Sequence, residues 1–171
     1  MRLSRLCFGL VVLTASVALA PLEGSAQQAI LLLRHAEQTP TGGMMEGDPP
    51  LNEHGQRRAD QLASLLKDAG IAAIYTSQYA RARQTVEPLA QAVGRDIRVI
   101  QKDDLAGLAA RLSTEHAGEV VLVVAHSDTI PKLLAALGHA APVEIGRSEF
   151  NNLWFIVPRA DNPPLVSRLK L

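Results

Sequence analysis

The sequence predicts an α/β fold, a three-layer α/β/α sandwich with a mostly parallel central sheet. Short apolar runs alternate along the chain with stretches of helical periodicity, the order expected when strands are joined by crossover helices. The runs near the start are apolar at every position, as in strands that are buried on both faces. Two of them stop abruptly at polar residues, which places charge at strand carboxyl ends, where ligands bind in such sheets.

Six segments have the pattern of strands. Val120–Ala125 has the strongest β pattern and ends directly at His126, just as Ala29–Leu33 ends at Arg34. The last two segments are separated by a turn around Pro163 and resemble a strand pair. The predicted strands are residues 29–33, 71–76, 97–100, 120–125, 153–157 and 165–169.

Four helices are predicted between these strands from their caps and stops. The first begins at Glu53 after the cap Asn52, and the second ends at Gly94. The fourth tolerates Pro131 because that residue falls in its first turn. The predicted helical segments are residues 53–70, 79–93, 105–118 and 129–137.

The first 26 residues are expected to be a cleaved signal peptide, followed by a single domain over residues 27–171. Arg2 and Arg5 precede an apolar stretch at 6–20, and small residues at 24–26 offer a cleavage site. Its removal changes 17 basic and 17 acidic residues to 15 and 16, a net charge of −1. No basic excess then indicates nucleic acid, and no stable membrane insertion is expected after cleavage. The only cysteine, Cys7, lies within the signal, so the mature domain has no disulfide.

Four polar side chains follow three of the predicted strands. Arg34 and His35 come after the first strand, Arg81 lies shortly after the second, and His126 follows the fourth. If these strand ends converge, two guanidinium groups and two imidazoles share a pocket that suits a phosphoryl dianion. We expect no metal and no cofactor there, because the arginines would repel a cation. No G-x-S-x-G motif indicates a serine hydrolase, and His54, His116 and His139 are expected to be solvated.

These motifs resemble those of the histidine phosphatase superfamily, which includes cofactor-dependent phosphoglycerate mutase. The resemblance covers roughly residues 29–157 and four motifs in order: Arg34-His35-Ala36-Glu37, residues 48–55, Ser77 with residues 81–85, and residues 123–127. It implies that His35 is the nucleophile and becomes transiently phosphorylated, while Arg34, Arg81 and His126 hold the phosphoryl oxygens. Ser77 and Gln84 are expected to brace the loop around Arg81.

The residue that would protonate the leaving group stays open. The longer members of the superfamily carry a glutamate in an inserted segment that is absent here, and Asp128 is separated from His126 by Ser127. Asp128 also fits as a helix cap, and Glu37, Glu46 and Asp48 are the other candidates. Without a strong acid, the enzyme would favour good leaving groups.

The sequence therefore predicts an exported, periplasmic or secreted phosphatase that hydrolyses a phosphate ester. Its partner would be a phosphorylated small molecule or a cell-envelope phosphate group. Two alternatives remain: a phosphatase directed at phosphohistidine in proteins, and a module that binds phosphate without turnover.

Overall fold

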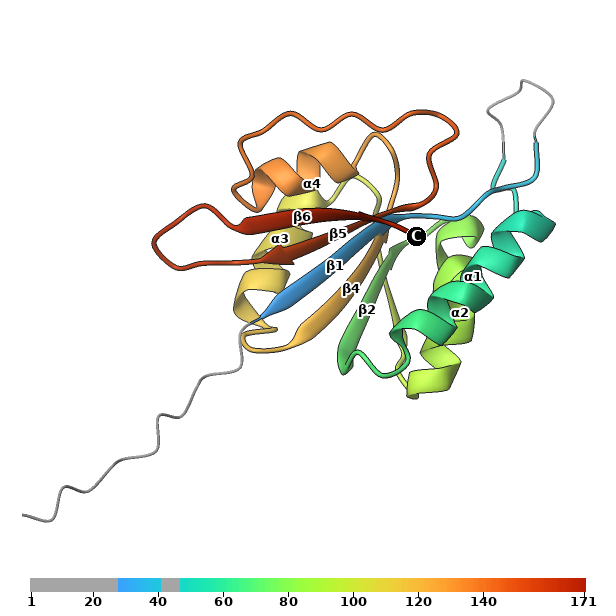
Figure 1. The fold of residues 1–171 in the computed structure, drawn as a ribbon, viewed down its shortest axis with the longest axis horizontal. Coiled ribbons are helices and arrows are strands. Elements are labelled where there is room, and N and C mark those ends of the chain that lie inside the picture. The colour runs from blue at the N-terminus through green and yellow to red at the C-terminus, as the bar shows by residue number, and fades with distance from the viewer. Residues whose placement is uncertain (1–27, 41–46) are drawn as a thin grey trace, which may run out of the picture.

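The computed structural model describes residues 28–40 and 47–171, and in these ranges it contains six strands and four helices (Figure 1). The expected signal peptide lies outside the described residues. The strands are β1 (Ala29–Arg34), β2 (Ile71–Ser77), β3 (Ile97–Ile100), β4 (Val120–Ala125), β5 (Asn152–Val157) and β6 (Leu165–Lys170). The helices are α1 (Glu53–Leu66), α2 (Ala80–Val93), α3 (Leu105–Thr114) and α4 (Ile130–Ala136).

All six strands form one sheet in the order β3-β2-β4-β1-β5-β6. The four strands β3, β2, β4 and β1 run parallel, whereas β5 is antiparallel to both of its neighbours, β1 and β6. This arrangement confirms the predicted α/β class and the mostly parallel sheet. It also makes β1 and β4 neighbours, so that Arg34 pairs in register with Ala125.

The helix boundaries follow from local chemistry. The side chain of Asn52 accepts a hydrogen bond from the amide of Gly55, which caps α1 as predicted. Gly94 ends α2 with a φ of 63°, a left-handed conformation that costs glycine least. Thr129, rather than Asp128, is the N-cap residue of α4, so the predicted capping role of Asp128 is wrong.

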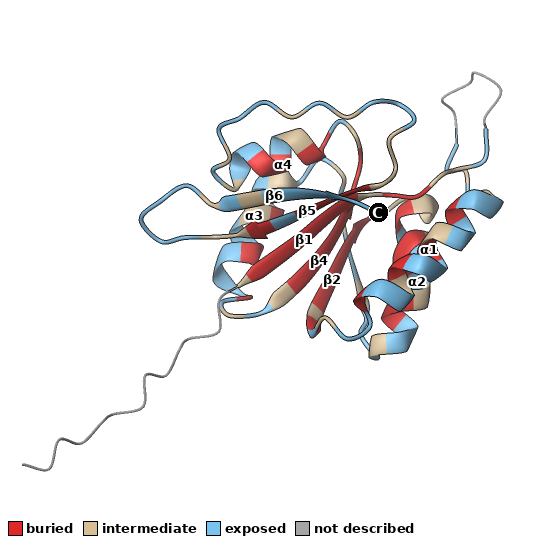
Figure 2. Cartoon of the chain, in the orientation of Figure 1, coloured by how far each residue is buried: buried red, intermediate tan, exposed pale blue. Residues whose placement is uncertain are grey.

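Two apolar cores cover the two faces of the sheet, as the red segments in Figure 2 show. Helices α1 and α2 pack on one face through Leu62 and Leu89, and helices α3 and α4 pack on the other through Leu112 and Leu133. Consecutive residues of β1 alternate between the cores: Leu31 and Leu33 belong to the first core, and Ile30 and Leu32 to the second. The predicted three layers are therefore present, and the parallel strands lie between them.

His116 is buried, and the expectation that it is solvated is wrong. Its ring is 3% exposed, with Nε2 2.9 Å from the hydroxyl of Tyr75 and Nδ1 2.7 Å from a carboxylate oxygen of Glu119. These partners replace the water that the imidazole loses on burial. His54 is exposed and His139 is half-buried.

No helix within residues 28–40 and 47–171 is long and apolar enough to cross a membrane.

Candidate active site

The two histidines predicted from the strand ends meet at the carboxyl ends of β1 and β4. The amide of His35 donates to the carbonyl of Ala125, at 3.0 Å, and so continues the pairing of the two strands by one residue. His126 is the next residue along β4, and the centroids of the two imidazole rings lie 5.1 Å apart. Parallel pairing in this register therefore brings together two residues that are 91 positions apart in sequence.

His35 is held in the neutral form with a defined tautomer. Its ring is 4% exposed, and Nδ1 donates to the carbonyl of Ala36 at 2.8 Å. Burial lowers its pKa to about 4; the Ala36 carbonyl opposes this effect, and the charges of Arg81 and Arg34 add to it. Because Nδ1 carries the proton, Nε2 has a free lone pair at neutral pH. His35 is thus prepared to act as a nucleophile.

His126 is also buried and neutral. Its Nε2 lies 2.7 Å from the hydroxyl of Ser77, and its amide donates to the hydroxyl of Thr129. Burial, followed by the proximity of His35 and Arg81, lowers its pKa to about 3. Ser77 therefore contacts a site residue directly, whereas the sequence assigned it only to bracing the loop near Arg81.

The two arginines approach the histidines from different elements. Arg34 ends β1, and its Nη1 donates to the carbonyls of Gly146, Arg147 and Glu149 at 2.9–3.2 Å. Arg81 lies in the first turn of α2 with its side chain 15% exposed. Within the described residues, Nε of each arginine is buried and has no hydrogen-bond partner. Each guanidinium therefore keeps one N–H group that could donate a hydrogen bond to an oxyanion.

Thr85 connects the segments that carry His35 and Arg81. Its hydroxyl accepts from the amide of Ala36 at 2.9 Å and donates to the carbonyl of Arg81 at 2.7 Å. Next to it in sequence, Gln84 accepts from the amide of Leu51, so its bond joins α2 to the segment before α1. The two segments are thus fixed relative to one another by hydrogen bonds that involve the backbone of both.

Three of the four candidate acids already have partners. Glu37 forms a two-pronged ion pair with Arg58 at 2.7–3.2 Å. This bond lowers the pKa of Glu37 despite partial burial. Asp128 lies 2.6 Å from Nζ of Lys102; burial raises its pKa, but the bond and charge of Lys102 outweigh burial and leave the pKa below its usual value.

Asp48, the third, accepts from the amide of Ala80 at the start of α2. The fourth candidate, Glu46, lies outside the described residues.

Two aromatic residues beside the site were not predicted from the sequence. The ring of Phe150 lies 6.0 Å from that of His35, and the ring of Tyr79 lies 5.3 Å from that of His126, between centroids. Phe150 reaches the site because β5, two residues further on, is placed next to β1. The sequence contains no signal for this pairing, whereas the position of Tyr79 between Ser77 and Arg81 could have suggested its role.

Among the described residues, no group of three or more histidine, cysteine, aspartate or glutamate side chains is placed to hold a metal ion.

Residues 30–109 match the family model described as "Histidine phosphatase superfamily (branch 1)". The "probable phosphoglycerate mutase GpmB" of Shigella dysenteriae serotype 1 is 41% identical over 71 residues, which are 40% of this chain and 33% of that protein. The chain therefore spans about a third of the length of the curated relatives it matches. In this sequence match and in the fold described above, the chain is similar to the histidine phosphatase superfamily.

Solved structures have the same fold at low sequence identity. The protein histidine phosphatase SixA, complexed with tungstate, has a TM-score of 0.68 and 17% identity over 83% of this chain and 96% of its own. A mycobacterial glucosyl-3-phosphoglycerate phosphatase has a TM-score of 0.64 and 16% identity over 85% of this chain and 98% of its own. These similarities concern the fold alone. They cover more of the chain than the segment that the family model matches.

Proposed function

We propose that this protein is a phosphatase that uses Nε2 of His35 as the nucleophile and passes through a phosphohistidine. The observation that carries the proposal is the state of His35: it is buried and neutral, its proton is held on Nδ1 by the Ala36 carbonyl, and it lies beside His126. A nucleophilic nitrogen of this kind needs no base to activate it.

The reaction then has two displacements at phosphorus. In the first, Nε2 of His35 attacks the phosphorus, the bond to the leaving-group oxygen breaks, and that oxygen leaves with the electron pair. In the second, water attacks the phosphohistidine, the N–P bond breaks, and inorganic phosphate is released while His35 recovers its lone pair. Arg34, Arg81 and His126 would stabilise the charge on the equatorial oxygens in both steps.

The test is whether a phosphoenzyme forms on His35. With radiolabelled phenyl phosphate and rapid acid-free quenching, we expect a labelled protein whose label is lost in acid. His35→Ala should remove both the label and turnover, whereas His54→Ala changes an exposed histidine on α1 and should alter neither. Label that persists in His35→Ala would refute the proposed nucleophile, and phosphate binding without any label would favour the non-catalytic module.

The substrates that fit best are those whose leaving group needs no proton. Glu37, Asp128 and Asp48 are engaged by Arg58, Lys102 and the amide of Ala80, and the pKa values of Glu37 and Asp128 lie below their usual values. Glu37 and Asp128 are therefore ionised and do not act as acids at neutral pH. Aryl phosphates and phosphohistidine both carry a good leaving group, a phenolate and an imidazole respectively. The second candidate function, a protein phosphohistidine phosphatase, therefore has the same support.

A leaving-group series separates these substrates. We expect phenyl phosphate to be hydrolysed at least 100-fold faster than ethyl phosphate in kcat/KM at pH 7, because an unassisted alkoxide is a far poorer leaving group. Equal rates would show that an acid does act on the leaving group. A phosphohistidine peptide measured alongside decides between the two functions, since a protein-directed enzyme should prefer the peptide to phenyl phosphate.

We also propose that the protein works outside the cytoplasm. This proposal is supported by the order of basic, apolar and small residues within positions 1–26. The substrates available there would be phosphorylated small molecules or phosphate groups of the cell envelope.

A further inference from the structure

Each arginine of the site lies over the face of an aromatic ring. The Cζ atom of Arg34 is 4.0 Å from the centroid of the Phe150 ring, and that of Arg81 is 4.3 Å from the centroid of the Tyr79 ring. Both distances are well inside the range in which a cation is attracted by the electrons of the ring. The two rings come from different parts of the chain: Tyr79 lies between β2 and α2, and Phe150 lies just before β5.

The rings also contact the two histidines, so the site consists of two similar units. Phe150 lies beside His35, and Tyr79 presents its ring to the edge of the His126 ring at 83°. The histidine rings in turn join the units, 5.1 Å apart. In each unit, one aromatic side chain thus contacts both a histidine and an arginine.

Carboxylates hold these arginines much less closely than they hold Arg58. Arg58 is bound by both oxygens of Glu37, so a carboxylate balances its positive charge. Arg34 makes no ion pair within the described residues; Arg81 lies 3.6 Å from one oxygen of Asp48, and both oxygens of Asp48 accept from Ala80 at 2.8 Å. A carboxylate on Arg34 or Arg81 would compete with a phosphoryl group for the same donors, whereas a ring face occupies no N–H donor and leaves the charge unbalanced. In Arg34, Nη1 is used by the three backbone carbonyls, and Nε has no partner within the described residues.

The arginines also need support because they repel each other in a buried place. Burial lowers the pKa of Arg34, and the charge of Arg81 lowers it further. The attraction of a ring face offsets part of this cost, and it is strongest where water is excluded.

We propose that Phe150 and Tyr79 are positioning residues that hold Arg34 and Arg81 in the orientation that binds a phosphoryl group, without neutralising them. The proposal deepens the function proposed above and rests on it for the identity of the ligand. It requires that each ring acts through its own arginine, and this requirement makes it testable.

The test is a pair of double-mutant cycles with inorganic phosphate as the probe. Phe150→Leu should weaken phosphate binding about 10-fold, the size expected of a desolvated cation–π contact. In the Arg34→Ala background the same substitution should change the Kd by less than about twofold, because its target is gone. Tyr79→Leu should behave in the same way with Arg81→Ala. Calorimetry gives the Kd, and kcat/KM for phenyl phosphate gives a second readout.

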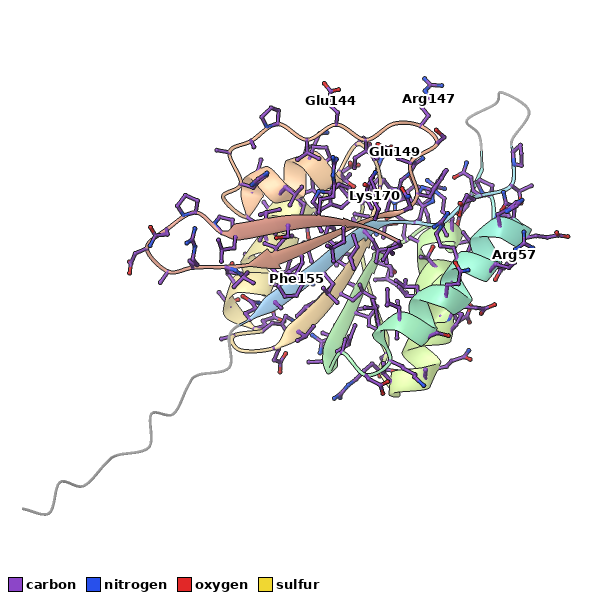
Figure 3. All side chains as sticks on the ribbon, in the orientation of Figure 1. Arg57, Glu144, Arg147, Glu149, Phe155 and Lys170 are labelled. Atoms are coloured by element: carbon purple, nitrogen blue, oxygen red, sulfur yellow. The ribbon has the colours of Figure 1, made fainter. Side chains whose placement is uncertain are left out.

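Conservative and remote variants serve as controls. Phe150→Trp and Tyr79→Phe keep an aromatic face and should bind phosphate within about twofold of the wild type. Phe155→Leu removes a ring of β5 that is 40% exposed (labelled in Figure 3), and it should leave the Kd unchanged. Equal losses in the wild-type and arginine-free backgrounds would overturn the proposal, as would failure of the aromatic replacements to restore binding.

The phosphate-binding cycles can fail or succeed independently of the phosphoenzyme test of the proposed function. If no phosphoenzyme forms on His35, catalysis as proposed fails, yet the phosphate-binding cycles still decide whether the rings act through the arginines. If Phe150→Leu lowers the thermal midpoint too far to measure binding, Phe150→Met keeps a similar volume without a ring face and takes its place in the cycle.

Discussion

At the scale of single residues, the site is defined by two imidazoles that the protein keeps uncharged. Both are about 4% exposed, and their pKa values are lowered to about 4 for His35 and about 3 for His126. Each has one ring nitrogen fixed by a hydrogen bond, to Ala36 or to Ser77. Because folding lowers these pKa values, the free energy of unfolding must depend on pH.

We therefore predict that the free energy of unfolding falls between pH 7 and pH 5 in the absence of phosphate. An unfolded histidine has a pKa near 6.5 and takes up a proton over this range, whereas the folded ones, with pKa values of about 4 and about 3, do not. The unfolded state then binds more protons, and each histidine costs on the order of 2 kcal/mol of stability at pH 5.

Urea unfolding at pH 5 and pH 7 measures this difference, and His126→Gln should reduce it by about half. The exposed His54→Gln is the control and should leave it unchanged. A wild-type stability that does not change over this range would contradict the neutral, buried state of both histidines.

At the scale of elements, the parts of the chain governed by local chemistry were predictable. Apolar runs gave the strands, and caps such as Asn52 and Gly94 gave the helix ends, within a few residues of those in the structure. The meeting of His35 and His126 was also predictable, because parallel strands bring their carboxyl ends to one edge. The side chains of the predicted site lie where the strand ends converge.

What depends on pairing between distant elements was not predictable. The place of β5 beside β1 brings Phe150 to His35, and nothing in the residues around Phe150 indicates this partner. The bond between Lys102 and Asp128 likewise joins two loops after different strands. Local sequence does not indicate this partner, and it shows only that Asp128 stands just before a helix, where a cap is expected. His116 looked solvated because its partners Tyr75 and Glu119 become neighbours only through the fold.

At the scale of the whole molecule, two cores hold one sheet and the site lies at the end of that sheet. The helices of each face pack on the strands and leave the strand ends to loops. Residues 27–171 contain no cysteine, so if residues 1–26 are removed as proposed, no disulfide would add to the stability that these cores give.

Export is the prediction that belongs to this scale. Expressed at full length in a Gram-negative host, the protein should appear outside the cytoplasm with Gln27 as its first residue, which cell fractionation and mass spectrometry of the N-terminus would establish. Placing arginine at both Leu10 and Val12 should block export and cleavage, because charge interrupts the apolar run, whereas Glu23→Ala outside that run should not. An uncleaved wild-type chain in the cytoplasm would overturn the proposal.

The segment between α4 and β5, orange in Figure 1, is joined to the site in an unusual way. Arg34 contacts it through three backbone carbonyls, and Glu149 fixes its end by bonding the amide of Gly146 and by pairing with Lys170 (Figure 3). Every amino acid supplies a backbone carbonyl, so the exposed side chains of Glu144, Arg147 and Ser148 are free to diverge while the anchor persists. Val143 and Ile145 are not, because they pack against one of the two cores. These exposed positions can thus change without disturbing the three carbonyls that hold Arg34.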